Sequence, residues 1–269
     1  MRHKLFPMWA CLSRCTLLLT GLVGLSVSAI SEAARYDVQT LGPTLQSYSE
    51  HRMGLNVHHD VAWSEQQGGN FYARMTTGGS IPSTLDLHAL ATPASITAYR
   101  SYAEDINDAR HVTGYVTDGP RETYSSAALW FWNTSTHSYQ YVDLGSATQT
   151  QIGGDAVETS SAYAISPYNS ALDRYYVAGF ARQVAGGTGA TPSQPVVWEI
   201  ASNGNVVGFR VLPLGVFSGG YGVAYGVTEN GVVVGGAAPS GGYLSAVYWD
   251  SFTSGATIVP ELRPGAGAG

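Results

Sequence analysis

The sequence predicts an all-β fold, a β-propeller-like array of about four four-stranded antiparallel blades that is open or forms an incomplete ring. Three observations predict it. The chain of 269 residues contains 33 glycines and 17 tyrosines, and only 12% of its residues are charged. Glycine with β-branched and aromatic residues in short alternating runs is typical of strands and turns. Short motifs also recur four times in the same order, at the spacing of propeller blades.

The first 33 residues have the layout of a secretory signal peptide. Basic residues come first, the run from 15 to 30 is apolar and uncharged, and cleavage sites follow Ala29 and Ala33. An uncleaved membrane anchor is the alternative, because roughly 17 to 25 apolar residues can span a bilayer. We expect cleavage, and therefore a secreted protein that is periplasmic, extracellular or at the cell surface, with no membrane span.

Cleavage after Ala33 would change both the cysteine content and the charge. Cys11 and Cys15 would be removed, so the mature chain would have no disulfide, no thiolate nucleophile and no cysteine metal site. It would keep 10 basic and 18 acidic residues, a net charge of −8. Because nucleic-acid binding needs clustered Lys and Arg, we expect no nucleic-acid partner.

Each repeat begins with an apolar anchor that ends a strand and is followed by a polar residue. The anchors are Leu55, Ile106, Ile165 and Val227, which are 51, 59 and 62 residues apart. A tight turn and a Val-rich returning strand are expected after each anchor. Asn230-Gly231 is the strongest hairpin signal, since both residues can adopt positive φ. In the third copy the turn is lengthened by residues 166–174.

A tryptophan strand and a Leu-Gly strand end complete each unit. The tryptophan strands end at Trp130, Trp198 and Trp249, and residues 71–75 take that place in the first copy. We expect these tryptophans, together with Trp132, in the core rather than as ligand platforms. The strand ends are Asp86-Leu87-His88, Asp143-Leu144-Gly145 and Pro213-Leu214-Gly215. The predicted repeat domain is 34–262, with units near 43–88, 89–145, 146–215 and 216–262, helix confined to the signal segment, and a Gly-rich tail at 263–269.

The stretch from 219 to 236 contains a second pattern, because Gly220, Gly222 and Gly226 approach the glycine spacing of a dinucleotide-binding loop. Such a loop must follow a strand, open a helix and belong to a βαβ unit. Here a hairpin pattern follows Gly226 and no helical pattern does. We therefore expect the glycines to allow close packing, and we expect no cofactor.

These units resemble the HAF repeat family of extracellular bacterial proteins. The family's unit reads approximately D-L-G-x-L-G-G, then S-x-A-x-G-I-N-x-x-G-x-V-V-G, then H-A-F-x-W. The match is best in residues 224–235 with 246–249 and in 86–114, while Tyr72-Ala73-Arg74 stands where the name-giving triplet would be. The third copy departs most, with its insertion and with Pro195 in place of alanine. The resemblance covers the mature chain and implies secretion and a propeller-like repeat, but no activity.

Two polar clusters could suggest a metal site. His58, His59 and Asp60 fall in the first hairpin turn, where adjacent histidines would point to opposite faces. Asp105, Asn107 and Asp108 alternate, but the remaining ligands of a calcium loop are missing. We expect a solvated turn and an Asx turn respectively, and no metal.

The sequence singles out no catalytic residue. It contains no G-x-S-x-G elbow. Paired carboxylates could meet across a propeller channel to cleave a glycoside. Nothing in the sequence distinguishes the four residues weighed for this role, Glu65, Asp155, Glu158 and Glu229.

The favoured function is a secreted, non-catalytic binding or surface-interaction module for an unknown extracellular ligand, a glycan or a protein. The alternative is an extracellular polysaccharide hydrolase with its site on one face of the propeller. Convergence of polar, titratable residues from different blades would discriminate between them. A stray first strand, 36–42, and the open final unit also predict a fragment of a longer protein or self-association through open repeat ends.

Overall fold

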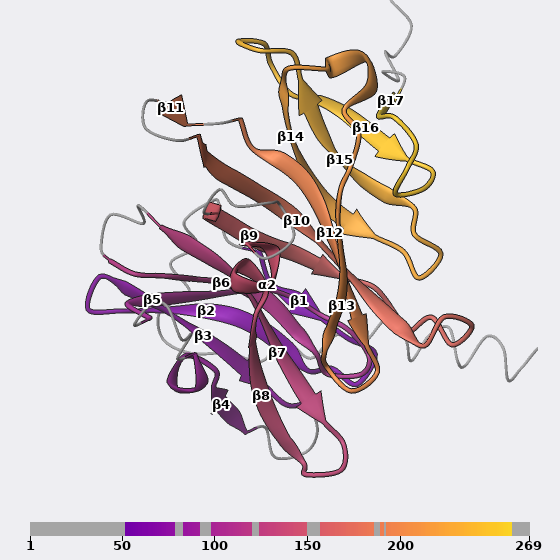
Figure 1. The fold of residues 1–269 in the computed structure, drawn as a ribbon. Coiled ribbons are helices and arrows are strands. Elements are labelled where there is room, and N and C mark those ends of the chain that lie inside the picture. Colours follow the sequence, from indigo (N-terminus) through magenta and orange to yellow (C-terminus); the bar gives the residue numbers. More distant parts are fainter. Residues whose placement is uncertain are drawn as a thin grey trace, which may run out of the picture. The chain divides into compact units, whose positions relative to one another are not determined.

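The computed structural model of the chain describes residues 52–78, 83–91, 98–119, 124–149, 157–185, 189–190 and 192–259. These residues form mostly antiparallel β-structure, which confirms the predicted all-β class (Figure 1). No helix among them is long and apolar enough to cross a membrane. The expected signal peptide, the strand 36–42 and the tail 263–269 lie outside the described residues.

The strands form four antiparallel groups of neighbours. The first group is β1 (Gly54–Leu55), β2 (Val61–Gln67), β3 (Asn70–Thr76) and β4 (Thr84–Asp86). The second is β5 (Arg100–Ile106), β6 (Val112–Thr117), β7 (Ser125–Asn133) and β8 (Ser138–Asp143). The third is β9 (Val157–Ile165), β10 (Arg174–Ala185), β12 (Gln194–Ala201) and β13 (Val206–Val211), with β11 (Gly189–Ala190) beside β10. The fourth is β14 (Tyr221–Val227), β15 (Val233–Ala238), β16 (Ser245–Trp249) and β17 (Thr257–Ile258).

Within each group the strands pair in chain order, so each group is a small up-and-down sheet. The second and third groups count as one nine-stranded sheet, because Ser125 of β7 and Thr159 of β9 form a parallel bridge. The first and fourth groups are separate four-stranded sheets. No sheet among the described strands closes on itself.

The stretch with the nucleotide-like glycines is a hairpin of β14 and β15, as the sequence predicts. Gly231 alone of the Asn230-Gly231 pair has positive φ, at 81°. The N–H of Thr228 donates to the carbonyl of Val232, and the N–H of Gly231 donates to that of Thr228, which is a turn with a left-handed residue closing it. Of the two residues that can adopt positive φ, this longer loop needs only one to do so.

The first two groups build the same turn without glycine. His59 has a φ of 62° and Arg110 a φ of 67°, and each occupies the position of Gly231. The backbone hydrogen bonds repeat as well, from Asn56 to Asp60 and from Asn107 to His111. The first, second and fourth groups thus share this turn geometry, even where the residue that closes it is not glycine.

Helix is not confined to the signal segment, which corrects the prediction from the sequence. Asp143-Leu144-Gly145 does not simply end a strand, because α2 spans Leu144–Gln149. The Asp143 carboxylate accepts the N–H of Ser146 at 3.1 Å, so it caps the first turn of this helix. Short 3-10 turns follow the fourth strands of the first and third groups, η1 (His88–Leu90) and η2 (Gly215–Phe217). The leucines that begin these three turns, Leu87, Leu144 and Leu214, are buried.

Three apolar cores join consecutive groups, and each is built from both neighbours. Leu87 and Met75 pack with Ile106 and Trp130 between the first and second groups. The other two cores repeat this plan, with Leu144, Ile165 and Trp198 in one and with Leu214, Val233 and Trp249 in the other. Trp130, Trp198 and Trp249 are fully buried, which confirms that they are core residues, whereas Trp132 is only partly buried.

Similar hydrogen bonds also cross these junctions, with the indole acceptor at the third junction one repeat position earlier than at the first. The indole Nε1–H of Trp130 donates to the carbonyl of Leu87 at 2.9 Å, and that of Trp249 donates to the carbonyl of Pro213 at 2.8 Å. The hydroxyl of a serine five residues before the anchor accepts a hydrogen bond from a backbone N–H of the preceding group. Ser101 accepts from Ala73 at 2.8 Å and Ser160 from Ala127 at 2.9 Å.

The third junction replaces this serine contact. Pro195 stands where the other groups have alanine and has no N–H to donate. Its partner position is Gly222, where an added Cβ would lie 3.2 Å from the Pro195 ring and 2.9 Å from Leu214. The two departures from the repeat therefore match each other, because the proline ring fills the space that a serine would use.

Candidate functional site

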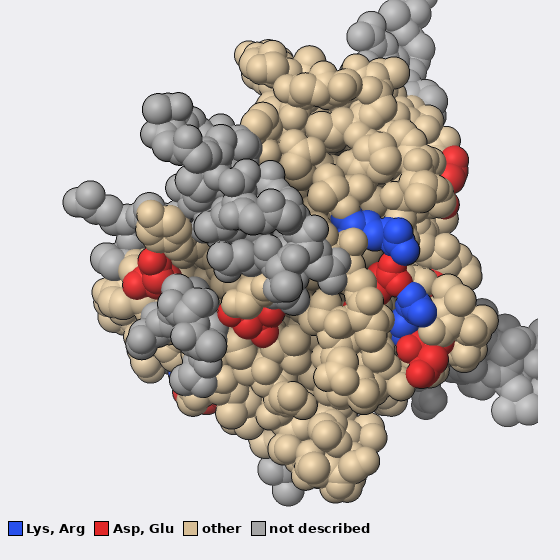
Figure 2. Space-filling view, viewed as in Figure 1, with Lys and Arg blue, Asp and Glu red and all other residues tan. Residues whose placement is uncertain are grey.

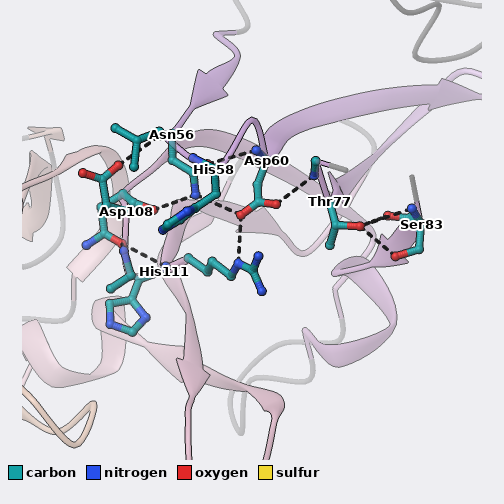
Figure 3. Close-up of polar contacts among 12 residues, drawn as sticks. Asn56, His58, Asp60, Thr77, Ser83, Asp108 and His111 are labelled. Carbon is teal, nitrogen blue, oxygen red and sulfur yellow. Dashed lines mark hydrogen bonds and ion pairs between the residues drawn. The ribbon is translucent and has the colours of Figure 1, made fainter. Parts of the chain in front are cut away.

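The cluster of His58, His59 and Asp60 is a structural network rather than a set of converging ligands (Figure 3). Asp60 is fully buried, and its carboxylate accepts hydrogen bonds from the Asn56 amide, the Gly78 N–H and the Arg110 guanidinium. His58 and His59 are exposed. Among the described residues, no group of three or more His, Cys, Asp or Glu could hold a metal ion.

The second polar cluster holds two hairpin turns together. Asp108 accepts the N–H of Val57 at 3.1 Å, and the Asn56 amide donates to the carbonyl of Asn107 at 3.1 Å (Figure 3). Asn107 Oδ1 accepts the N–H groups of Ala109 and His111, so the Asx turn expected from the sequence is present. These polar residues join the first strand group to the second.

His111 is a buried imidazole that sequence analysis did not single out. Its Nδ1 accepts the N–H of Trp132 at 3.1 Å, and its ring stacks on Phe131 at a centroid distance of 4.1 Å. No described residue forms a hydrogen bond with its Nε2. Burial lowers the pKa of His111 to about 3, so the ring is neutral at physiological pH.

Of the four carboxylates weighed for glycoside cleavage, the two that the structure describes, Glu65 and Glu229, have separate surroundings. Glu65 pairs with Arg74 at 2.8 Å, in a triad with Asp86. Glu229 lies in the β14–β15 turn, where its carbonyl accepts the side-chain amide of Asn169. Asp155 lies outside the described residues, as does the side chain of Glu158.

A different set of side chains converges from all four strand groups. β5, β9 and β14 each contain a β-bulge two residues before the anchor, and the extra residues are Glu104, Tyr163 and Tyr225. Bulges redirect side chains and are over-represented at functional sites. Arg52, which precedes β1, reaches the same place. We call Arg52, Glu104, Asp105, Tyr163 and Tyr225 the bulge cluster.

Arg52 binds the two tyrosines of this cluster. Its Cζ lies 4.7 Å from the ring centroid of Tyr225 and 5.4 Å from that of Tyr163, within the range of cation–π contacts. Its Nη1 also donates to the carbonyl of Tyr225 at 3.1 Å. The two rings lie 5.6 Å apart, so a single guanidinium covers both.

The acidic residues of the bulge cluster are shielded from water. Glu104 is only 3% exposed. Burial raises the pKa of the Asp105 carboxyl, against the lowering effect of the N–H groups of Ile165 and Ile106 and of the Arg52 charge. Burial also raises the pKa of the Tyr163 hydroxyl, and the negative charge of Glu104 adds to this increase.

The arrangement suits recognition better than acid–base chemistry. Glycoside cleavage by paired carboxylates needs two carboxyl groups roughly 5 to 9.5 Å apart that both face the substrate. Asp105 instead uses one oxygen to accept the Ile106 N–H and the other to accept that of Ile165. Its carboxylate therefore holds β5 against β9.

No protein-family model and no curated protein matches the chain. The resemblance to the HAF repeat family therefore stays a prediction from the motifs. The charges on the face seen in Figure 2 are few and of mixed sign.

Proposed function

We propose that the protein is a secreted, non-catalytic binding module with a propeller-like repeat of the HAF type. The strand groups are its four blades, and each lies inside one of the ranges 43–88, 89–145, 146–215 and 216–262. The recurrence of the same core and hydrogen-bond contacts at consecutive junctions supports this assignment. Signal cleavage then accounts for export to the periplasm or cell exterior.

The bulge cluster is the binding site in this proposal, and the observation that carries it is the triple bulge. One extra residue enters β5, β9 and β14 at the same repeat position, although each bulge disrupts its strand pairing. Three separate departures from regular pairing bring Tyr163 and Tyr225 to one guanidinium and place the charge of Glu104 near Tyr163. A repeat that served only as a scaffold would have no need to gather these side chains.

The proposal is tested by measuring ligand binding of the exported protein against arrays of glycans and peptides. Tyr225→Ala should weaken binding of any ligand that the arrays identify by at least about tenfold, because stacking on an aromatic ring is lost. Tyr243→Ala is the matched control, since Tyr243 is 95% exposed and lies outside the cluster. Equal binding by both variants would place the site elsewhere.

A parallel screen for polysaccharide hydrolysis separates this function from the alternative one. If the protein is a binding module, the screen should detect no hydrolysis that the Glu104→Gln substitution abolishes. Export is tested by N-terminal sequencing of the secreted chain, which should begin at Ile30 or Ala34. A secreted chain that still begins at Met1 would contradict the assignment of a signal peptide.

A further inference from the structure

The groups that surround the Arg52 guanidinium are all suited to a cation. They are two tyrosine rings, whose faces carry negative potential, the backbone carbonyl of Tyr225, and the carboxyl group of Asp105, whose negative charge interacts favourably with that of Arg52. Arg52 comes from the segment before β1, whereas the groups that receive it lie on β5, β9 and β14. Strands of the second, third and fourth groups therefore form the receptor, and Arg52, which precedes the first group, occupies it.

We infer that the bulge cluster is a site for a guanidinium or alkylammonium group, which Arg52 occupies as an internal ligand. An arginine side chain of a peptide ligand takes its place when the protein binds. The inference rests on the proposed function, since it names the ligand class of the same site. Arg52 is exposed, so a competing cation can reach the rings without opening the core.

The geometry favours a planar cation over a spherical one. A guanidinium can lie flat over an aromatic ring while its edge donates hydrogen bonds, and Arg52 combines both contacts. A compact ammonium can use either the ring faces or the carbonyl, but it presents a smaller surface to both rings. We therefore expect arginine to bind more tightly than lysine.

Chemical rescue tests the site directly. Arg52→Ala should lower the unfolding temperature of the mature protein by about 3 to 6 °C, because it removes two cation–π contacts and one hydrogen bond. Methylguanidinium at a concentration of roughly 20 mM should restore at least about half of this loss. N-methylurea, which has a similar shape and no charge, should not, and the double variant Arg52→Ala/Tyr225→Ala should not respond to methylguanidinium. Equal effects of methylguanidinium on the wild type and on Arg52→Ala would overturn the inference.

Peptide binding separates this inference from the proposed function. Arg52→Ala should bind an arginine-containing peptide at least about tenfold more tightly than the wild type does, because the internal competitor is gone. The same peptide with citrulline in place of arginine should bind neither protein. Equal binding of the arginine and citrulline peptides would overturn the cation site, but the protein would still be a binding module. Rescue by methylguanidinium without binding of any array ligand would support the cation site and count against the proposed function.

Discussion

The side-chain amide of Asn107 donates a hydrogen bond to the backbone carbonyl of Ser166, 59 positions later in the chain, at 3.0 Å. Asn56 makes the same contact one group earlier, to the carbonyl of Asn107, and Asn169 makes a similar one to Glu229. Each junction between strand groups therefore contains an amide that reaches forward to the next hairpin turn. At the first two junctions the linking residue directly follows the apolar anchor and was recognised in the sequence only as polar, whereas at the third junction it is Asn169, within the lengthened turn.

Asn107→Asp should destabilise the protein by about 1 to 3 kcal/mol, because a carboxylate cannot donate to the buried carbonyl of Ser166. The substitution keeps the oxygen that accepts the N–H groups of Ala109 and His111, so it isolates the forward contact. Urea unfolding measures the change in the free energy of unfolding. Asn230→Asp, in an exposed turn, should alter it by less than about 0.5 kcal/mol. Similar losses in both variants would contradict this account of the junction.

Gly222→Ser should also be destabilising, because the new side chain would meet Leu214 and Pro195. Adding Pro195→Ala should recover part of the loss, since it frees space and supplies the N–H that Ser101 and Ser160 accept elsewhere. A double-mutant cycle should give a favourable coupling between the two substitutions of about 0.5 to 3 kcal/mol. Strictly additive effects would mean that the proline and the glycine are unrelated.

The buried imidazole of His111 should make the protein acid-sensitive. Its pKa is about 3 in the folded protein and near 6.5 in the unfolded chain, so the unfolded chain binds the proton first as the pH falls. The stabilisation is complete above pH 6.5 and is lost between about pH 6.5 and 3, by up to about 1.4 kcal/mol per pH unit.

His111→Gln removes this titration and provides the comparison. As the pH is lowered, the free energy of unfolding should fall more for the wild type than for the variant. Chemical shifts of the His111 ring should not titrate above about pH 4. A ring that titrates near pH 6 would show that the imidazole is accessible to protons in the folded state.

The outward face of the fourth strand group should promote self-association. Ala178 of the third group is buried against the fourth, whereas Val234, at the equivalent position of the fourth group, is 51% exposed. Light scattering should detect concentration-dependent dimers, which Val234→Asp should weaken by at least about tenfold. Val207→Asp, on an exposed part of β13, is the control, and a monomer at all concentrations would contradict the prediction.

The strands could be predicted because their signals are local. Alternation in β14, the turn at Gly231 and the recurring tryptophans specify hairpins and buried positions without knowledge of the rest of the chain. The signal for α2 was also local but was missed. An aspartate is a common helix N-cap, and the Asp143 carboxylate accepts the N–H of Ser146, three residues later. From sequence alone, the Leu-Gly motif that follows Asp143 instead predicts the end of a strand.

The bulge cluster could not be predicted in the same way. Glu104, Tyr163 and Tyr225 occupy the same repeat position, and this can be read from the sequence alone. Their convergence depends on one-residue register shifts that only strand pairing reveals. The position of Arg52 depends on contacts with residues more than 100 positions away, and no local pattern encodes them.

The forward direction of the asparagine contacts bears on how the protein emerges during synthesis. The amide of Asn56 must wait for a carbonyl 51 positions later, and that of Asn107 for one 59 positions later. The ribosome adds roughly 5 to 20 residues per second, so each turn remains incomplete for several seconds after its own residues have appeared. A newly made N-terminal turn therefore lacks this hydrogen bond until the next strand group has been synthesised.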